Sequence, residues 1–435
     1  MTAPAVPTQG SKFEKITITS ADGNKTVDLR QGVAAFQYFE NLFSPALTAT
    51  MRVVNTGNTI EGRGVYNGLP IRGGEKVEIH LTTPYEIYKK ETPGVFEITM
   101  YVNSVQDYVQ EKQDETFILN LISKEGIVNF NKRIIKKYTA QRIDEIIKDF
   151  LDIIECEEID GELEKTINTY SFVGNMRKPF TLAPMLGIRG IPEGANKSSA
   201  GFFLWQTRKG MRFRSIETLC KNEKFDQEYA FDRKNEGVEN PESSFSKILE
   251  YGLLNNNNIT GAQTNGEYST YRIYFNPNTL KFTMPNESVF NASDKPQETL
   301  GTEENKPPDI VDPKKIPSPE MSHRIVSGVY SVGTLEPSSV GVAATAINMD
   351  QTEDVSQNIS RFSSVFTQII TMTVPINVSL CAGDTVKCLF PQVSTEDAVD
   401  DSQSGLYIIK EISHYVSGNR SYSAMKVIRD TSGLK

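Results

Sequence analysis

The sequence predicts a mainly β protein with an α+β insertion, and three observations carry this prediction. Apolar and polar residues alternate along the first part of the chain, as they do in antiparallel strands that bury one face. Between residues 143 and 154 the spacing changes to that of an amphipathic helix. Alternation then returns between residues 370 and 429. This order predicts an antiparallel barrel at each end of the chain, with a mixed domain between them.

The first segment, residues 13–125, has the clearest strand pattern. Asn67-Gly68 and Gly73-Gly74 favour tight turns between its strands. Residues 1–12, rich in Pro, Ala and Thr, are expected to form a loose arm, and they lack the basic and apolar runs of a signal peptide. The expected strands are Lys15–Thr19, Ala46–Val54, Lys76–Leu81, Val95–Val102 and Phe117–Ile122.

The middle segment, residues 126–240, is expected to be a mixed α+β domain. Thr139 is a candidate N-cap for its helix, and Asp144 and Lys148 are expected to pair on the solvent face. Residues 201–207 and 211–216 flank Arg208-Lys-Gly210 and indicate a hairpin. The apolar stripe of the helix consists of Ile143, Ile146, Ile147, Phe150, Leu151 and Ile154.

The least generic stretch of the chain is Phe172-Val-Gly-Asn-Met-Arg-Lys-Pro-Phe180. Two cations between aromatic residues suit a docking segment for a partner protein. The alternative is a strand, a turn and a helix start with exposed cations, because proline favours the first turn of a helix. The candidate docking residues are Phe172, Asn175, Arg177, Lys178 and Phe180.

The second barrel is assigned to residues 241–290 and 323–435, with the segment 291–322 between them. Six prolines occur within residues 291–320, which predicts an extended or disordered loop. A helix is expected at about 352–368, from apolar residues spaced four and three apart. The expected strands of this part are 268–275, 280–284, 370–377, 385–390, 406–413 and 424–429.

The last block of strands echoes the first. Gly74-Glu-Lys-Val parallels Gly383-Asp-Thr-Val, and Gly94 and Gly405 each open a later alternating strand. Glycine before a strand suits a turn that requires a positive φ. Two hairpins can look alike by chance, but order, spacing and turn chemistry agree here. The echo therefore predicts a duplicated barrel, an architecture more typical of assembly components than of enzymes.

Composition excludes several classes of protein. The 435 residues carry a formal net charge of −9, which argues against an ordinary nucleic-acid binder with a basic stripe. No apolar run is long enough for a membrane helix. Four cysteines are too few for a disulfide scaffold, and their spacing does not match a zinc site, so they are expected to be reduced thiols.

The sequence contains no convincing catalytic, cofactor or metal site. Its three histidines, His80, His323 and His414, have no second histidine at metal-ligand spacing, and the common nucleotide and hydrolase motifs are absent. A Cys388–His414 pair is conceivable because both residues fall in the second barrel, but a core cysteine is the simpler interpretation. The sequence therefore predicts no enzyme activity, although a carboxylate pair suited to sugar hydrolysis remains open.

Several segments resemble the central baseplate hub protein family of T-even-type contractile-tailed bacteriophages. They are Phe172–Phe180, Ala200–Thr207 and Phe213–Ile216 of the middle domain, and Ser360–Gln368, Thr373–Asn377 and Ala382–Val386 of the second barrel. The resemblance extends over about residues 14–430. Pro184 departs from it within a stretch expected to be helical, and so does the Pro-rich segment.

This resemblance implies two tail-tube-type β-barrels in each subunit of a homotrimer. Three such subunits form a ring with pseudo-sixfold symmetry, which joins a hexameric tail tube to a trimeric cell-puncturing spike. The implied partners are the spike protein, the tube or tube-initiator protein and baseplate wedge proteins, with the tape measure protein and DNA passing through the channel. The implied location is the tail baseplate of the virion, after synthesis in the host cytoplasm. The alternatives are a tail-associated cell-wall or polysaccharide hydrolase and a glycan-binding adhesin.

Overall fold

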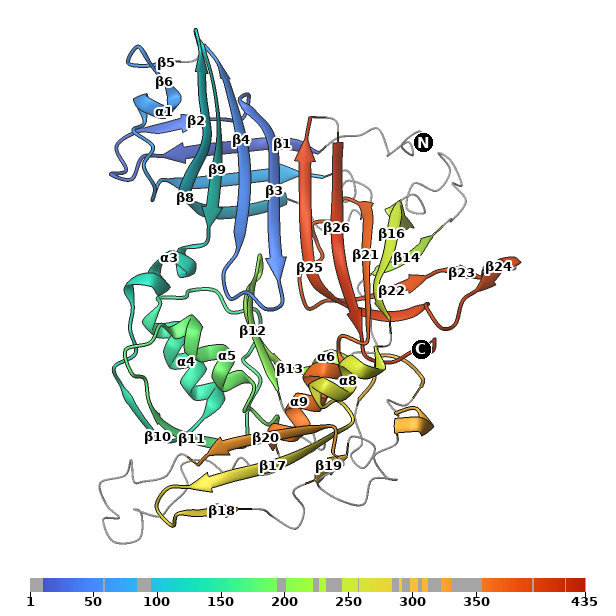
Figure 1. Cartoon of the computed structure of the whole chain (residues 1–435). Helices are drawn as coiled ribbons and strands as arrows, with labels where there is room; N and C mark the ends of the chain where they lie inside the picture. The colour runs from blue at the N-terminus through green and yellow to red at the C-terminus, as the bar shows by residue number, and fades with distance from the viewer. Residues whose placement is uncertain are drawn as a thin grey trace.

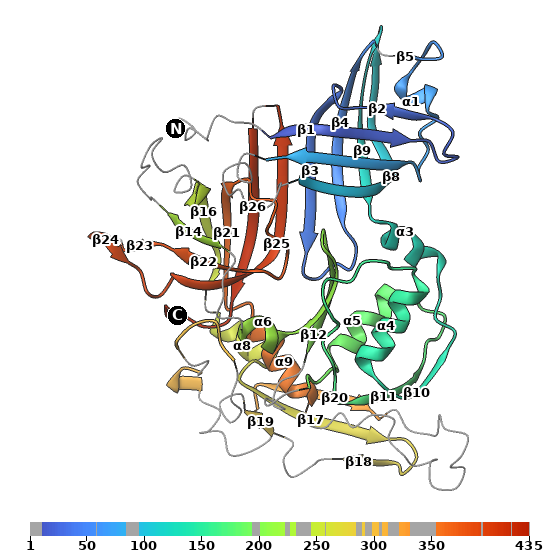
Figure 2. The same ribbon diagram turned by 180° about the vertical axis from the view of Figure 1, so that it is seen from behind.

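The structure is a computed structural model, and most of its strands join in one large sheet (Figure 1). Within the described residues this sheet has 14 strands. Its neighbouring strands are antiparallel, except that β14 runs parallel to β15 and β22. Smaller sheets and helices lie beside it (Figure 2). The described residues are 11–57, 59–83, 95–193, 201–221, 227–231, 245–256, 258–283, 289–291, 298–303, 307–311, 322–330, 354–392, 395–418 and 420–434.

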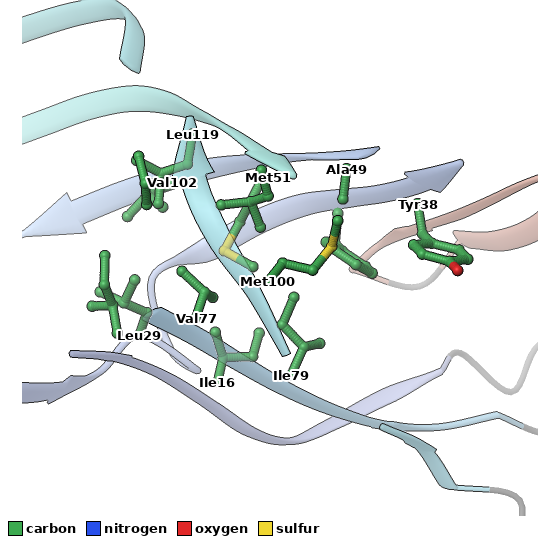
Figure 3. Close-up of a cluster of buried hydrophobic side chains, with 14 of the residues drawn as sticks. Ile16, Leu29, Tyr38, Ala49, Met51, Val77, Ile79, Met100, Val102 and Leu119 are labelled. Carbon is green, nitrogen blue, oxygen red and sulfur yellow. The ribbon is translucent and has the colours of Figure 1, made fainter. Parts of the chain in front are cut away.

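The first barrel begins directly after the N-terminal residues, at Lys12. Its strands run in the spatial order β3-β4-β9-β8-β7-β1-β2, and every neighbouring pair is antiparallel. Alternate side chains point inward and form its core (Figure 3). The strands are β1 (Lys12–Thr19), β2 (Thr26–Asp28), β3 (Val33–Asn41), β4 (Thr48–Thr56), β7 (Lys76–Thr82), β8 (Val95–Glu111) and β9 (Asp114–Ile122).

A short connection links β4 to β7 and differs from the expected pair of tight turns. It contains β5 (Thr59–Ile60), β6 (Arg63–Gly64) and the single helical turn α1 (Val65–Gly68). Asn67-Gly68 therefore ends a helical turn instead of forming a hairpin. Gly73 and Gly74 do form the expected turn, with φ values of 111° and 92°.

The second barrel has the spatial order β16-β21-β26-β25-β22-β14. Strand β14 was expected in the middle domain. It pairs with β22 instead, in parallel, because the chain returns to the sheet before residue 240. The strands are β14 (Gln227–Phe231), β15 (Lys247–Ile248), β16 (Glu250–Asn256), β21 (Gln368–Pro375), β22 (Thr385–Leu389), β23 (Pro391–Gln392), β24 (Thr395–Val399), β25 (Gly405–Ser417) and β26 (Arg420–Arg429).

The two barrels share one strand order, which confirms the sequence echo as a structural repeat. Strands β3, β4, β7, β8 and β9 correspond, in this order, to β16, β21, β22, β25 and β26. Strand β14 takes the place of β1 in the order but runs in the opposite direction, since it is parallel to β22 whereas β1 is antiparallel to β7. Gly74 and Gly383 fall at equivalent positions before β7 and β22, with φ values of 92° and 86°. The chain is therefore mainly β, with two similar barrels and mixed α+β material between them.

The middle region packs helices against two small hairpins. The stripe of α4 is buried as expected, and Lys148 is exposed. The hairpin of β12 and β13 also forms as expected. The elements are α3 (Lys124–Asn131), β10 (Lys137–Arg142), α4 (Ile143–Ile153), β11 (Thr169–Val173), α5 (Pro179–Gly187), β12 (Phe202–Thr207), β13 (Gly210–Ser215) and α6 (Ile216–Lys221).

Two local predictions for α4 are wrong. Thr139 does not cap the helix, because it lies in β10, which pairs with β11, and Arg142 occupies the N-cap position. Asp144 is not on the solvent face. Its carboxylate is buried and accepts hydrogen bonds from the backbone and hydroxyl of Thr166, at 3.1 and 2.8 Å. The segment that carries Thr166 covers the first turn of the helix.

Helix α5 forms in spite of Pro184, and it begins at Pro179 as the sequence predicts. Proline at the first helical position lacks only an N–H group that would have no partner inside the helix. Pro184 is tolerated within a helix of nine residues. Pro184, where the sequence departs from the family that it resembles, therefore does not interrupt the helix.

A long insertion separates β16 from β21. Helix α9 begins and ends near the predicted limits of 352–368, and β21 starts at Gln368. Part of the Pro-rich segment 291–322 lies outside the described residues. Leu300, within it, is fully buried, and its N–H donates to Asp430, so this part is packed instead of loose. The elements are α8 (Ile259–Asn265), β17 (Ser269–Asn276), β18 (Lys281–Thr283), β19 (Val289–Asn291), the 3₁₀ turn η3 (Asp309–Val311), β20 (Arg324–Val329) and α9 (Asp354–Ser364).

Candidate assembly interface

The two barrels join edge to edge through β3 and β25, and we call this contact the internal joint. The strands pair antiparallel from Asn41 opposite Glu411 to Phe36 opposite Val416. The side chain of Gln37 donates across the joint to Ser413 at 2.8 Å. The lower part of β25 pairs with β22 and its upper part with β3, so this long strand belongs to both barrels.

The buried carboxylate of Glu40 ties three parts of the chain together at the internal joint. It accepts hydrogen bonds from the N–H groups of Arg208, in the β12–β13 hairpin, and Ala382, in the second barrel, at 2.8 and 2.7 Å. The Tyr38 hydroxyl also donates to it at 2.8 Å. Burial raises the pKa of Glu40, and these donors offset part of that cost. The contact fixes both barrels and the middle region relative to one another.

His414 is a structural residue of the joint. Its ring stacks on Tyr38 with centroids 6.0 Å apart, and its Nδ1 lies 2.9 Å from the Ser423 hydroxyl. Burial, followed by the nearby Arg208 cation, lowers the pKa of His414 to about 3. The imidazole is therefore neutral at neutral pH.

The conceivable Cys388–His414 pair does not form. The thiol of Cys388 contacts the sulfur of Met372 at 3.9 Å, inside the core of the second barrel. Burial raises the pKa of Cys388 to about 12, so the thiol stays protonated. A protonated thiol without an adjacent base is not a nucleophile.

The internal joint also extends the sheet into a row that spans both barrels. Among the described strands, eight lie side by side in the order β8, β9, β4, β3, β25, β26, β21 and β16 (Figure 1). The row is two equivalent sets of four strands. One face of the row packs into the barrel cores, and we call the other, half-exposed face the open face.

The open face mixes uncharged polar side chains with half-exposed apolar ones such as Phe39 and Ile118. Across the joint it forms a groove of about 810 Å³ between β3, β25, β26, β21 and β16. The uncharged polar residues of the open face include Gln37, Thr48, Thr50, Thr116, Asn120, Thr371, Thr373 and Ser413.

Charges on the open face nearly cancel. Lys426 pairs with Glu411 at 3.1 Å, and Lys410, at the bulge of β25, lies 2.9 Å from the same carboxylate. With Lys410 included, the described face carries as many cations as acids, so its charge does not favour polyanions. The charged residues placed on this face by strand alternation are Arg52, Glu111, Asp114, Glu250, Glu411, Arg420 and Lys426.

The predicted docking residues are only partly exposed. Phe172 stacks between Tyr138 and Tyr170, at 5.0 and 5.3 Å, and Phe180 packs on the same core. The Lys178 ammonium lies over the Phe130 ring, 3.6 Å from its centroid. The structure therefore turns the two aromatic residues inward and holds Lys178 against a neighbour.

The exposed part of this segment is the turn between β11 and α5. Asn175 and Met176 both have positive φ values, 48° and 56°, and Met176 is 65% exposed. Arg177 is exposed beside them and contacts the Met185 sulfur. Sequence reasoning missed Met176. Its position in the sequence could have indicated it, since Met176 lies between Asn175 and Arg177, two of the residues proposed for docking.

Sequence reasoning also missed the outer edges of the eight-strand row, where apolar side chains are exposed on β8 and β16. Val109 is 53% exposed, and Leu253 and Leu254 are 42% and 60% exposed. Among the described residues, no cluster of three or more His, Cys, Asp or Glu side chains is arranged to hold a metal ion. In the same residues, no helix has the length and apolar content needed to cross a membrane.

Comparison with known proteins identifies the fold. No protein-family model matches the sequence. No curated protein is similar to it in sequence. The 43 kDa tail protein of prophage MuSo2 from Shewanella oneidensis matches in structure with a TM-score of 0.52 at 9% identity, over 96% of this chain and 100% of that one. A tail protein from Neisseria meningitidis matches with a TM-score of 0.53 at 8% identity, over 97% of each chain.

These matches extend over nearly the whole length of all three chains, and their identity is low enough that they establish the fold alone. They agree with the resemblance to phage tail proteins seen in the sequence. The chain therefore has the fold of these tail proteins, which confirms at the level of fold its likeness to proteins of phage tails.

Proposed function

We propose that this protein is a structural hub of a contractile phage tail baseplate. In this proposal three copies form a ring with pseudo-sixfold symmetry, which joins the hexameric tail tube to the trimeric cell-puncturing spike. Baseplate wedge proteins bind around it, and the tape measure protein and DNA pass through its channel. The protein acts in the virion without catalysing a reaction. The observation that carries the proposal is the repeated strand order of the two barrels.

The repeat supports a symmetry adapter for a geometric reason. Two equivalent barrels in each chain give six equivalent positions in a trimer, so one side of the ring matches a sixfold partner. The insertion between β16 and β21 occurs in the second barrel only. It therefore recurs three times around such a ring, and a threefold spike meets three identical sites.

The open face of the eight-strand row supports a channel for DNA. If this face lines the channel, DNA meets Thr, Asn, Gln and Ser side chains, some apolar side chains such as Phe39, and a balanced set of charges. DNA carries one negative charge per roughly 1.7 Å, so a basic wall would retain it. A wall without excess cations lets DNA slide, which favours a channel over a DNA-binding surface.

The buried chemistry of the described residues supports a structural role. The thiols of Cys381 and Cys388 are buried with raised pKa values, and His414 is held neutral in the joint. A nucleophile requires an oriented base and access to substrate. These groups have neither, so they contribute to packing.

The proposal is tested by electron microscopy and native mass spectrometry of the full-length protein, alone and with its spike. We expect three chains of 48.6 kDa and class averages with threefold symmetry, a central hole and six similar inner lobes. A stable dimer or tetramer overturns the ring. Hydrolysis of purified cell wall by the protein, lost when one acid pair is changed without loss of assembly, overturns the non-enzymatic role.

A further inference from the structure

A groove separates the outer edge of β11 from helix α5 in the middle region. In the part of the chain that the structure describes, β11 pairs only with β10, so its other edge has no strand beside it. Helix α5 lies across a groove of about 380 Å³ from this edge. The lining comes from β11, the turn that follows it and one side of α5, and it includes Phe172, Val173, Arg177, Leu182, Met185 and Arg189.

The backbone of β11 directs hydrogen-bonding groups to this outer edge. The N–H of Gly174 donates to the Lys136 carbonyl at 3.1 Å, so Gly174 faces β10. Backbone groups of an antiparallel strand alternate between its two edges, which turns the N–H and C=O of Val173 outward. An outward N–H and C=O on an uncovered edge are the groups to which an added strand bonds.

Both ends of the groove are held by contacts within the chain. At one end, Gly174 lies so close to Ile134 that a Cβ has no room. At the other end, the Asn168 side chain donates to the Arg189 carbonyl at 2.7 Å and accepts from the Ile191 N–H at 2.9 Å. The five residues of β11 span about 17 Å and the nine of α5 about 14 Å, so strand and helix match in length. The groove is therefore preformed and admits about five extended residues.

The floor of the groove is apolar. Leu182 and Leu186 of α5 are buried in the core of the middle region, and Phe172 packs against the same core. On the rim, Val173 is 42% exposed and Met185 is 40% exposed. An extended segment directs alternate side chains to opposite faces, so one row of them meets the floor while its backbone pairs with β11. The groove therefore suits a segment with apolar side chains at alternate positions.

The two ends of the groove carry positive charge. Arg177 lies just before α5 and Arg189 just after it. The Arg177 guanidinium lies 3.3 Å from the Met185 sulfur, and that of Arg189 donates to the Tyr170 hydroxyl at 3.0 Å. Among the described residues, neither guanidinium is paired with a carboxylate, and no residue that lines the groove is acidic. In a chain of net charge −9, this local charge favours an acidic partner.

We propose that the groove binds an extended, acidic segment of a partner protein, which adds to β11 as a third strand of the β10–β11 sheet. Its backbone pairs with the outward N–H and C=O of Val173. Its alternate apolar side chains cover Phe172 and Leu182, and carboxylates near its two ends meet Arg177 and Arg189. The inference concerns a single subunit and goes beyond the hub function proposed above.

The first test uses a synthetic peptide and the full-length protein. The peptide has about seven residues, with valine and threonine alternating between two terminal glutamates, and blocked ends. We expect saturable binding by fluorescence anisotropy and slower amide hydrogen exchange in β11. One control peptide has glutamine in place of glutamate, and another has N-methyl groups on its backbone nitrogens. Each control should bind at least about tenfold more weakly, because the first lacks charge and the second cannot pair as a strand.

Charge variants of the protein locate the peptide. Arg177→Gln and Arg189→Gln should each weaken binding of the glutamate peptide by about tenfold. Neither should change the weaker binding of the glutamine peptide, which distinguishes a lost ion pair from a distorted groove. The matched control is Arg30→Gln, since Arg30 is an exposed arginine of the first barrel and should not affect binding. Circular dichroism confirms that each variant is folded.

A backbone variant tests strand pairing from the side of the protein. Val173→Pro removes the outward N–H, and proline is tolerated on an edge strand where that N–H points away from the sheet. Its binding of the glutamate peptide should fall by about tenfold, whereas Val173→Ala, which keeps the N–H, should bind within about twofold of the unaltered protein. If Val173→Pro does not fold, the N-methylated peptide decides the same point.

Three outcomes contradict the proposal. The first is no saturable binding of the glutamate peptide. The second is equal binding of the N-methylated peptide, which means that the segment does not pair as a strand. The third is equal weakening by Arg30→Gln and by the two groove variants, which means that only net charge matters. None of these measurements depends on the number of chains in the ring, so the hub proposal stands or falls separately.

Discussion

The first barrel is built from one continuous stretch, Lys12–Ile122, whereas the second is assembled from Gln227–Asn256 and Gln368–Arg429. Both nevertheless have the same strand order. The insertion lies between β16 and β21 in the sequence. Because these two strands are neighbours in the sheet, they still pair with each other. The difference teaches that hairpins such as β8–β9 and β25–β26 determine the order of the sheet, and that continuity of the chain does not. A long loop adds little to the free-energy cost of closing a contact.

The largest expected effect tests whether the two barrel cores are equally important. Met51 and Met372 occupy equivalent positions, and both are buried. We expect Met51→Ala and Met372→Ala each to lower the free energy of unfolding by about 2–5 kcal/mol, because each leaves a cavity. Urea unfolding measures the loss, with Thr50→Ala and Thr371→Ala as equivalent controls on the open face. A much smaller loss for Met372→Ala would show that the interrupted barrel does not unfold together with the first.

A smaller effect distinguishes the two equivalent turns. A side chain at Gly74 meets no atom within 4 Å, whereas a Cβ at Gly383 would meet the Trp205 ring at 2.4 Å. Both glycines have positive φ, so alanine costs about 1–2 kcal/mol at either site. We expect Gly383→Ala to cost about 1–3 kcal/mol more than Gly74→Ala, since it also crowds a packed site. Equal losses in thermal unfolding would mean that Trp205 moves away freely.

The smallest effect concerns pH and the internal joint. The pKa of His414 is about 3 in the folded protein, below its ordinary value of 6.5. As the pH falls below 6.5, the unfolded chain binds a proton there and the folded chain does not, so stability falls. For one histidine this amounts to about 2 kcal/mol between pH 7 and pH 5.

His414→Phe removes this contribution. The variant should therefore lose about 2 kcal/mol less than the unaltered protein over the same pH range. The raised pKa of Glu40 has the opposite sign, because the folded protein binds that proton first as the pH falls. Urea unfolding at pH 7, 6 and 5 measures both slopes, and identical slopes for the two proteins would mean that His414 takes up its proton in the folded state.

The sequence predicts those features of the fold that depend on neighbouring residues. The alternation along β4, β9, β21 and β26 and the stripe of α4 appear in the structure because each element buries one face. The repeat was predictable as well, since Gly74 and Gly383 mark the same turn. Asp144 was misplaced because its burial depends on Thr166, which a distant segment brings to the helix.

The candidate interface was mostly beyond sequence analysis. Val109 and Leu253 lie on strands that the sequence predicts poorly, and their exposure depends on which strand edges remain unpaired. That in turn depends on the pairing of β3 with β25, whose residues are separated by more than three-quarters of the chain. No periodic pattern encodes such a contact. Strand β14 illustrates the same limit, because its parallel partner β22 follows far along the chain.

The distance along the chain between the two sides of the internal joint has a kinetic consequence. Gln37 and Ser413 are separated by 376 positions, so the joint closes only after nearly the whole chain has been synthesised. Contacts of such high sequence separation form slowly. Until then, the edges of β3 and β25 have the same shape as those of β16 and β8, and another chain competes for them. We expect refolding to give misjoined chains at high protein concentration and correctly closed ones at low concentration, because only the first outcome is bimolecular.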